Sequence, residues 1–363
     1  MVDSVDTGKS KFDKEGSSGE YPILGSTSVI GYDDEYDYEG DFILTARVGA
    51  NAGSLYRHAG KVKISDNTVF IQASQNIEFL YQLLTRFDIK KLSFGTGQPL
   101  VKASELKSLE LMMPTNMKEQ MRIGAYFNQL DHLITLHQRK CEETKKLKKY
   151  MLQKMFPQNG QTVPEIRFAG FTDAWEQRKL SELLYLSSER NDGSYTRDDV
   201  LAASLGTELQ KKHIYFGLRA TDESVKNYKV VLPNDVIYTK SPIKGFPNGI
   251  IRTSKGENGI VPTLYCVYHS VDVINPSIIQ AYFESKERLD AYLVPLVNIG
   301  ARNNVNITDK EFLDGSLCIP KDKDEQDKIV NVLERLSNLI TLHQHKCEQL
   351  QSMKKFMLQN MFV

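Results

Sequence analysis

The sequence predicts an α+β protein in which two globular domains of mixed helix and strand are separated by two long antiparallel coiled-coil helices, with pseudo-twofold symmetry. First, residues 119–156 recur as residues 325–362 at a constant offset, and 20 of the 38 positions are identical. Second, apolar residues in both copies recur at intervals of three, four and seven, which is typical of one face of a helix. Third, the stretches before the two copies contain short apolar runs between turn residues, which are typical of strands.

Composition limits the class of protein. A chain of 363 residues accommodates two or three domains. Lys plus Arg and Asp plus Glu both number 46, so the chain is neither a polycation nor strongly acidic, although a local basic surface remains compatible with that balance. Four cysteines are too few for a disulfide framework and fit a reducing cytoplasm. The sequence contains neither a signal core nor a run of about 18 apolar residues. We therefore expect a cytoplasmic protein that does not contact a membrane.

The first predicted domain comprises residues 1–115. It contains the runs YPILG, DFILTARVG and NTVFIQ, each of which has glycine, aspartate or asparagine at one end or both. Such runs are typical of strands that are buried on one or both faces. The domain is therefore expected to be rich in strands.

The two copies of the repeat predict spacer helices over residues 116–156 and 321–363. Asn116 with Glu119, and Asp322 with Glu325, have the spacing of capping boxes at helix starts. At 1.5 Å per residue each helix would extend about 57 Å. Matching apolar stripes on two such helices favour antiparallel pairing as a coiled coil. The alternative is that they are ordinary packing helices inside one large domain.

A linker and a second domain lie between the helices. Residues 157–172 are rich in Pro, Gly, Asn and Gln, and we interpret them as a linker and the start of the second unit. Residues 173–320 again alternate apolar runs with turn residues, as in KVVLPNDVIYTK and IVPTLYCVYH. They predict a second mixed domain.

The chain shows no motif that predicts catalysis. The helices do present two pairs of metal-capable residues, each pair one helical turn apart, at His137 with Cys141 and His343 with Cys347. If the helices crossed near these positions, the four side chains would suit a zinc ion. The alternative is that the histidines and cysteines occupy positions in the helix–helix core, where a free cysteine behaves as a small apolar residue.

The motif EQ…LITLHQ…KCE…MLQ-x-MF occurs in both repeats, and the segment PEIRFAGFTDAWEQRKLSELL occupies residues 164–184. In these motifs the sequence resembles the specificity subunits of type I restriction–modification systems. In that family two target recognition domains alternate with two conserved helices, so residues 1–115 and 173–320 would be the recognition domains. No equivalent of PEIRFAGFTDAWEQRKL precedes the first domain, which we therefore expect to be N-terminally short.

The resemblance implies a non-catalytic subunit that reads a bipartite, asymmetric target in double-stranded DNA. Its implied partners are two modification subunits, which methylate adenine, and restriction subunits, which translocate and cleave DNA. S-adenosylmethionine, ATP and magnesium are expected on those partners, with no cofactor on this chain. Two alternatives remain open, namely a coiled-coil adaptor that does not bind DNA and an inactive rearranged specificity allele.

Candidate DNA-binding residues are basic or amide side chains beside glycine-rich loops. Such side chains contact phosphates or pair with guanine and adenine. Lys240, Lys244, Arg252 and Lys255 are expected on phosphates. The repeat offset aligns Thr96 and Gln98 with Arg302 and Asn304, so these loops are the strongest candidates for reading two different half-sites. The complete set is Arg47, Arg57, Lys61, Lys63, Thr96, Gln98, Lys240, Lys244, Arg252, Lys255, Arg302, Asn303 and Asn304.

Overall fold

The computed structural model describes residues 2–11, 18–93, 99–158, 160–203, 210–211, 222–243, 245–296 and 307–362. The chain forms two compact units. The first combines Met1–His137 with Lys346–Val363, and the second is Gln138–His345. These units differ from the linear division into domain and spacer, because each unit contains one domain together with parts of both long helices.

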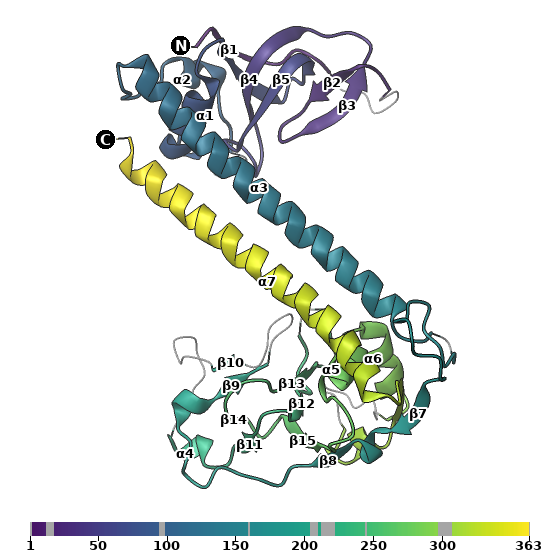
Figure 1. Cartoon of the computed structure of the whole chain (residues 1–363). Coiled ribbons are helices and arrows are strands. Elements are labelled where there is room, and N and C mark those ends of the chain that lie inside the picture. Colours follow the sequence, from purple (N-terminus) through teal and green to yellow (C-terminus); the bar gives the residue numbers. More distant parts are fainter. Residues whose placement is uncertain are drawn as a thin grey trace. The chain divides into compact units, whose positions relative to one another are not determined.

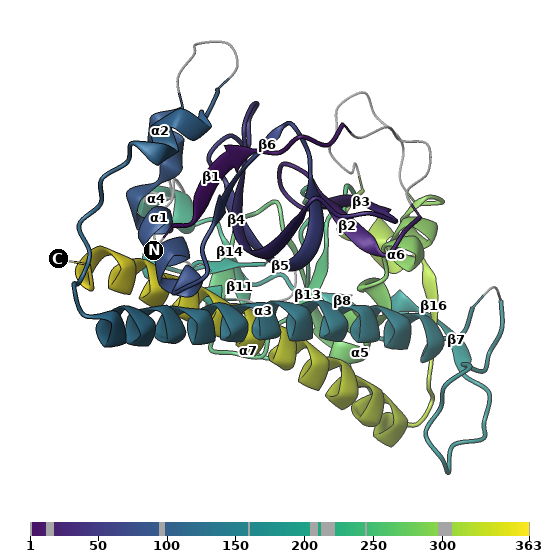
Figure 2. The same cartoon turned by 90° about the horizontal axis from the view of Figure 1, so that it is seen from above.

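The first unit is built on a mixed sheet, in which β2 and β5 are parallel and the other neighbouring strands are antiparallel. Its strands are β1 (Ser4–Thr7), β2 (Tyr21–Leu24), β3 (Val29–Asp33), β4 (Tyr38–Ala46), β5 (Leu55–Ile64) and β6 (Thr68–Gln72). The order in the sheet is β1-β6-β4-β5-β2-β3. The helices are α1 (Ile77–Phe87), the 3-10 turn η1 (Ile89–Leu92), α2 (Ala103–Lys107) and α3 (Met117–Lys154), which continues into the second unit. Figure 2 shows β1 beside α1 and α2, with β2 and β3 at the other end of the sheet.

Alternation along the central strands gives this sheet two buried faces. Phe42 and Leu44 of β4 pack with Val62, Ile64 and Phe70 on one face. Ile43 packs on the opposite face with Val69, Ile71 and the α1 residues Leu80 and Leu84. Successive side chains of a strand point to opposite faces, so two apolar layers require an uninterrupted apolar run. The runs FIL and VFI in the sequence meet this requirement.

The first unit also contains the last turns of α7 (Lys323–Asn360), which pack against the first half of α3. The apolar stripe of α3, predicted from its spacing, is buried here together with Cys347, Leu350 and Phe362. Lys354 donates a hydrogen bond to Asp131 at 2.6 Å, and the hydroxyl of Tyr126 lies 3.9 Å from the sulfur of Met353. Figure 1 shows these two helix segments running in opposite directions.

The second unit contains a four-stranded antiparallel sheet in the order β13-β12-β15-β8 and three two-stranded pairs, β10-β9, β11-β14 and β16-β7, among the described residues. Its strands are β7 (Glu176–Lys179), β8 (Leu184–Leu186), β9 (Leu201–Ala202), β10 (Gln210–Lys211), β11 (Lys229–Val231), β12 (Val236–Tyr238), β13 (Ile251–Thr253), β14 (Gly259–Val261), β15 (Cys266–Ser270) and β16 (Ser316–Ile319). Its helices are η2 (Leu180–Glu182), η3 (Arg197–Asp199), α4 (Asp222–Val225), α5 (Ser277–Phe283), α6 (Lys286–Leu293) and η4 (Glu311–Leu313), with the second half of α3 and the first half of α7.

The main core of the second unit joins this sheet to both long helices. Phe156, two residues after α3, packs edge-on against Trp175 with ring centroids 5.7 Å apart, and Leu333 of α7 lies in the same cluster. The thiol of Cys141 lies 3.9 Å from the carbonyl oxygen of Ile340, so α3 and α7 are also antiparallel neighbours here. The predicted fold class, two mixed domains with two long antiparallel helices, is therefore confirmed.

The sequence duplication extends to individual contacts. Gln120 in the first unit and Gln326 in the second are repeat equivalents, and both side chains are buried. Gln120 donates to the carbonyl of Pro114 and accepts from Asn76, which precedes α1. Gln326 donates to the carbonyl of Pro320 and accepts from the backbone of Asn275, just before α5. In each unit, the side-chain amide of the equivalent glutamine thus attaches the domain to the start of a long helix.

The predicted capping boxes are only half present. Asn116 and Asp322 do cap their helices, since their side chains accept from the backbone N–H of Lys118 and Asp324. The side chain of Glu325, however, bonds to Arg167 and Trp175. No helix in the described part of the chain combines the length and apolar character that crossing a membrane requires.

Candidate nucleic-acid interface

Seven of the thirteen predicted DNA-binding residues lie in the part of the chain that the structure describes, and six do not. Thr96, Gln98, Lys244, Arg302, Asn303 and Asn304 lie outside the described residues. The other seven positions are described, and their surroundings separate exposed residues from residues that hold the fold together.

Arg47 follows β4 and is exposed on a firmly held backbone. Its N–H donates to the carbonyl of Asn67 at 2.9 Å, and its own carbonyl accepts from Val101 at 2.8 Å. Gly49 donates to Pro99 at 3.0 Å. Residues 99 and 101 immediately follow the predicted loop that contains Thr96 and Gln98. The backbone therefore fastens the C-terminal side of that loop beside Arg47.

Lys61 and Lys63 lie two residues apart on β5 and so point to the same face of the sheet. The ammonium of Lys61 lies 4.7 Å from the ring centroid of Tyr36, which in turn contacts the ring of Tyr21 at 5.1 Å. Lys63 forms an ion pair with Asp33 at 2.9 Å, and this hydrogen bond raises the pKa of the Lys63 ammonium. Exposed lysine beside aromatic rings is a chemistry that suits a nucleic-acid backbone.

The structure places Arg57 in a structural position. Its guanidinium pairs with Glu78 of α1, lies 3.3 Å from the amide oxygen of Asn128 on α3, and stacks 4.6 Å from the ring centroid of Tyr81. These contacts join β5 to the helices. They occupy the donors that a phosphate would need, which disagrees with the expectation from the sequence.

Lys240 is also held in an ion pair, and its partner, Asp309, follows the stretch that carries the candidates Arg302, Asn303 and Asn304. Lys229 and Lys240 both donate to Asp309, at 2.5 and 2.9 Å. Burial of the Asp309 carboxyl opposes ionisation, but the hydrogen bonds from the two lysines prevail and hold its pKa at about 2. Asp309 follows closely after the predicted DNA-reading residues Arg302–Asn304, so this cluster fastens the chain on the C-terminal side of that loop.

Arg252 does not fit the expected phosphate contact, because its side chain is only 3% exposed. It lies 3.7 Å from the carboxylate of Glu284, which also receives Lys148 of α3 at 2.5 Å. Burial opposes ionisation of Glu284, but these two cations together lower the pKa of its carboxyl. The side chains of Lys148 and Glu284 are each only 13% exposed, so this ion pair is largely buried. Lys255 in turn pairs with Glu334 of α7.

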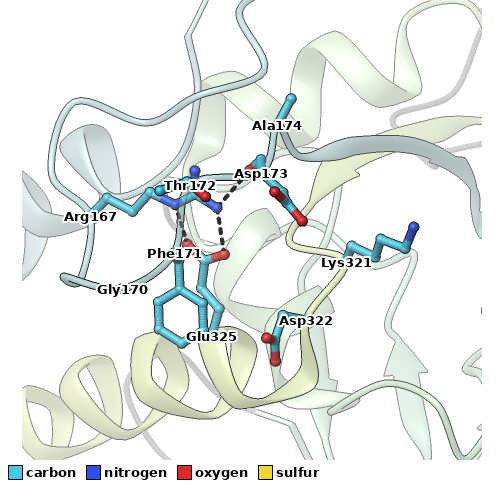
Figure 3. Close-up of a pocket in the computed structure, with 9 residues that line it drawn as sticks. All are labelled: Arg167, Gly170, Phe171, Thr172, Asp173, Ala174, Lys321, Asp322 and Glu325. Carbon is cyan, nitrogen blue, oxygen red and sulfur yellow. Dashed lines mark hydrogen bonds and ion pairs between the residues drawn. The ribbon is translucent and has the colours of Figure 1, made fainter.

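The segment quoted for the family resemblance forms a joint at the start of α7 (Figure 3). Arg167 makes two hydrogen bonds to Glu325, from Nε at 2.7 Å and from Nη2 at 2.9 Å. The indole N–H of Trp175 donates to the same carboxylate at 3.3 Å. Directly afterwards, β7 pairs antiparallel with β16. A cavity of about 320 Å³ opens beside the pair and is lined by residues 170–174 and by Lys321 and Asp322.

The predicted metal pairs are not assembled into a site within the described residues. No three His, Cys, Asp or Glu side chains in that part of the chain lie close enough together to hold a metal ion. Cys141 and Cys347 are buried along α3 and α7. Their surroundings favour the alternative that they are core residues of the paired helices.

Residues 3–146 match the family model described as the type I restriction modification DNA specificity domain. The type I restriction enzyme EcoprrI specificity subunit of Escherichia coli is 26% identical over 115 residues, which cover 31% of this chain and 28% of that subunit. The putative type I restriction enzyme MjaX specificity subunit of Methanocaldococcus jannaschii is 22% identical over 337 residues, which cover 82% and 73% of the two chains.

The fold is shared with a solved structure. The crystal structure of the type I restriction–modification system S subunit from M. genitalium matches with a TM-score of 0.68 at 14% identity, and the match covers 100% of this chain and 94% of that one. At this identity the match shows that the two chains share a fold. The resemblance of this chain to the specificity subunits of type I restriction–modification systems is confirmed.

Proposed function

We propose that this chain is the DNA-reading subunit of a type I restriction–modification complex. Each of its two domains reads one half of a bipartite, asymmetric target. The chain itself is not catalytic, and it directs adenine methylation and restriction by its partner subunits.

One observation carries this proposal. The buried amides of Gln120 and Gln326 fasten two domains of different topology to equivalent helix positions, as described above. Like attachments with unlike domains suit a protein that must present two different readers in equivalent ways to the two halves of one DNA site. An adaptor that binds only proteins gains nothing from diversifying the domains while keeping the attachments.

The base-reading groups are proposed to lie on the two loops that carry Thr96 and Gln98 in the first domain, and Arg302, Asn303 and Asn304 in the second. Arginine pairs bidentately with guanine, and glutamine or asparagine with adenine, each contributing about 1–3 kcal/mol of discrimination. Arg47, Lys61 and Lys244 supply phosphate contacts. Lys63 and Lys255 would first have to exchange their carboxylate partners, Asp33 and Glu334, for phosphates. Arg57, Lys240 and Arg252 support the fold.

Two modification subunits and the restriction subunits are the proposed protein partners. S-adenosylmethionine, ATP and magnesium would then be bound by those subunits. The long helices α3 and α7 offer extended faces for docking a subunit beside each domain.

The test is co-expression of the chain with a cognate modification subunit, followed by mapping of methylated adenines across the host genome. A bipartite motif with a fixed gap is the expected result, and it yields both half-sites. A stable complex without methylation would favour the inactive rearranged allele. Absence of DNA binding with retained subunit binding would favour the adaptor.

A further inference from the structure

The repeat allows the two units to be compared position by position around the start of each long helix. In the second unit, residues 164–179 cover this region and Glu325 is 1% exposed. Its repeat equivalent in the first unit, Glu119, is exposed and its carboxylate has no ion-pair partner among the described residues. The same acidic residue is therefore buried in an arginine pair in one unit and open in the other.

The adjoining strand differs in the same way. In the second unit, Ser316–Ile319 form β16 and pair with β7, and Leu317 and Ile319 are buried. The equivalent stretch of the first unit is Glu110–Met113. It is not part of any strand, and its backbone makes no hydrogen bond to the backbone of any described residue. A row of unpaired backbone groups is a template for an added strand.

The uncovered region is apolar as well as unpaired. Met112 is 86% exposed, and Met113, Met117 and Met121 are also exposed. A cavity of about 320 Å³ lies beside this stretch, lined by Leu111, Met112, Leu83 and Phe87, with Arg86 and Lys91. Clustered exposed methionines are typical of surfaces that bind polypeptides, because the flexible thioether adapts to the side chains it meets.

We propose that this surface of the first unit, Glu110–Met113 together with Glu119, binds an extended segment of another polypeptide with the chemistry of residues 164–179. The arginine of that segment pairs with Glu119, and its strand adds antiparallel to Glu110–Met113. Side chains of the added strand enter the cavity beside Leu111 and Met112. The occupant is inferred from the chain itself, because the second unit displays such a segment seated on the equivalent positions.

A further equivalent position supports the same occupant. In the second unit the ammonium of Lys328 lies 4.6 Å from the ring centroid of Phe171, within the covering segment. The repeat equivalent of Lys328 is Arg122, which is exposed in the first unit. A guanidinium interacts with an aromatic face as an ammonium does. The surface thus offers an anion, a cation and an open strand edge at the positions where the second unit uses them.

The probe is a fluorescein-labelled synthetic peptide of residues 164–182, titrated with the full chain and followed by fluorescence anisotropy. We expect one peptide to bind per chain. A peptide carrying Arg167→Ala, and the Glu119→Gln protein with the unchanged peptide, should each bind at least tenfold more weakly. Because Glu119 is exposed, this variant retains its fold, and Lys118→Gln serves as the neighbouring control with unchanged affinity. A peptide of the same composition in scrambled order is the control for non-specific binding to the exposed methionines.

Hydrogen exchange locates the bound peptide. Strand addition should slow exchange of alternate amides within Glu110–Met113, because every second N–H of the stretch becomes hydrogen-bonded to the added strand. The proposal is overturned by absence of binding at about 1 mM peptide, by equal affinity for the scrambled peptide, or by equal affinity of the Glu119→Gln protein. It is also overturned if exchange changes at 316–319 instead, which would mean that the peptide displaces the resident segment of the second unit.

Discussion

The guanidinium of Arg167 and the carboxylate of Glu325 form a two-point ion pair, with Nε and Nη2 at 2.7 and 2.9 Å from the two carboxylate oxygens. The pair joins the segment after α3 to the first turn of α7, and Trp175 adds a third hydrogen bond. All donors aim at one buried carboxylate. Each partner is therefore the main compensation for burying the other.

Replacing Glu325 by alanine should destabilise the second unit by about 3–5 kcal/mol, since it leaves the Arg167 charge without its partner in a largely buried place. The measurement is the free energy of unfolding from urea titration. The matched control is Glu119→Ala, the same change at the exposed repeat equivalent, which should alter stability by about 0.5 kcal/mol or less. Equal losses in the two variants would contradict the structural difference between the two glutamates.

Phe362→Ala should destabilise the first unit by about 3–5 kcal/mol. The ring of Phe362 is buried, with centroids 5.6 Å from Phe79 and 6.0 Å from Phe127, and the guanidinium of Arg86 lies over it. Its control is Phe356→Ala, the same change within α7 at a residue that is 62% exposed. Denaturant unfolding should separate the two variants, and protease resistance of the first domain should fall only for Phe362→Ala.

The Asp309 cluster predicts a stability contribution that is lost in acid. The pKa of its carboxyl is lowered from 3.8 to about 2. A carboxyl with a lowered pKa contributes stability above its unfolded pKa and loses it as the pH falls through the folded value. Asp309→Asn should therefore cost about 1–2 kcal/mol at neutral pH, allowing for solvent screening, and the difference from the parent chain should vanish between about pH 4 and pH 2. A difference that stays constant down to about pH 2 would exclude the ion pairs as its source.

Affinity for DNA should depend on salt. Each phosphate neutralised should contribute about −0.9 to the slope of log affinity against log salt concentration. Lys61→Gln should reduce the magnitude of that slope by about one and leave base preference unchanged. Lys107→Gln, an exposed lysine on α2, is the control. A flat salt response of the parent chain would argue against direct DNA binding.

The gap between the two half-sites should follow helix length. Adding about four residues, one helical turn, to both α3 and α7 near their midpoints should change the permitted gap. The sequences of both half-sites should remain the same, because neither domain is altered. Methylation mapping checks this directly, and a changed half-site with an unchanged gap would disprove a spacing role.

The long helices were predictable because their signals are local and repeated. Their apolar stripes run along each helix. The predicted N-caps Asn116 and Asp322 directly precede the first residues of α3 and α7. The burial of both faces of the first sheet also follows from its continuous apolar runs. These features depend on residues close together in the chain, which periodicity reports well.

The roles of individual cations were not predictable, because they depend on partners far away in the sequence. Arg252 and Lys148 are separated by more than a hundred residues and meet at one buried carboxylate, Glu284. Arg57 finds its partner on α1. Neither pairing leaves a local signal, so basic residues near glycines were all interpreted as candidate DNA contacts. The identity of Gln120 with Gln326 in both repeats was a usable signal for their shared attachment role, and it was missed.

The composition of the first unit has a consequence for the order of events during synthesis. Its core includes Cys347, Leu350 and Phe362, whereas the second unit is one continuous stretch of chain. On the ribosome the second unit therefore has all of its residues before the first unit does. The N-terminal domain must wait, with the apolar stripe of α3 uncovered, for residues translated more than two hundred codons later. Loss of residues 346–362 would consequently damage a domain whose other residues lie more than two hundred positions earlier in the chain.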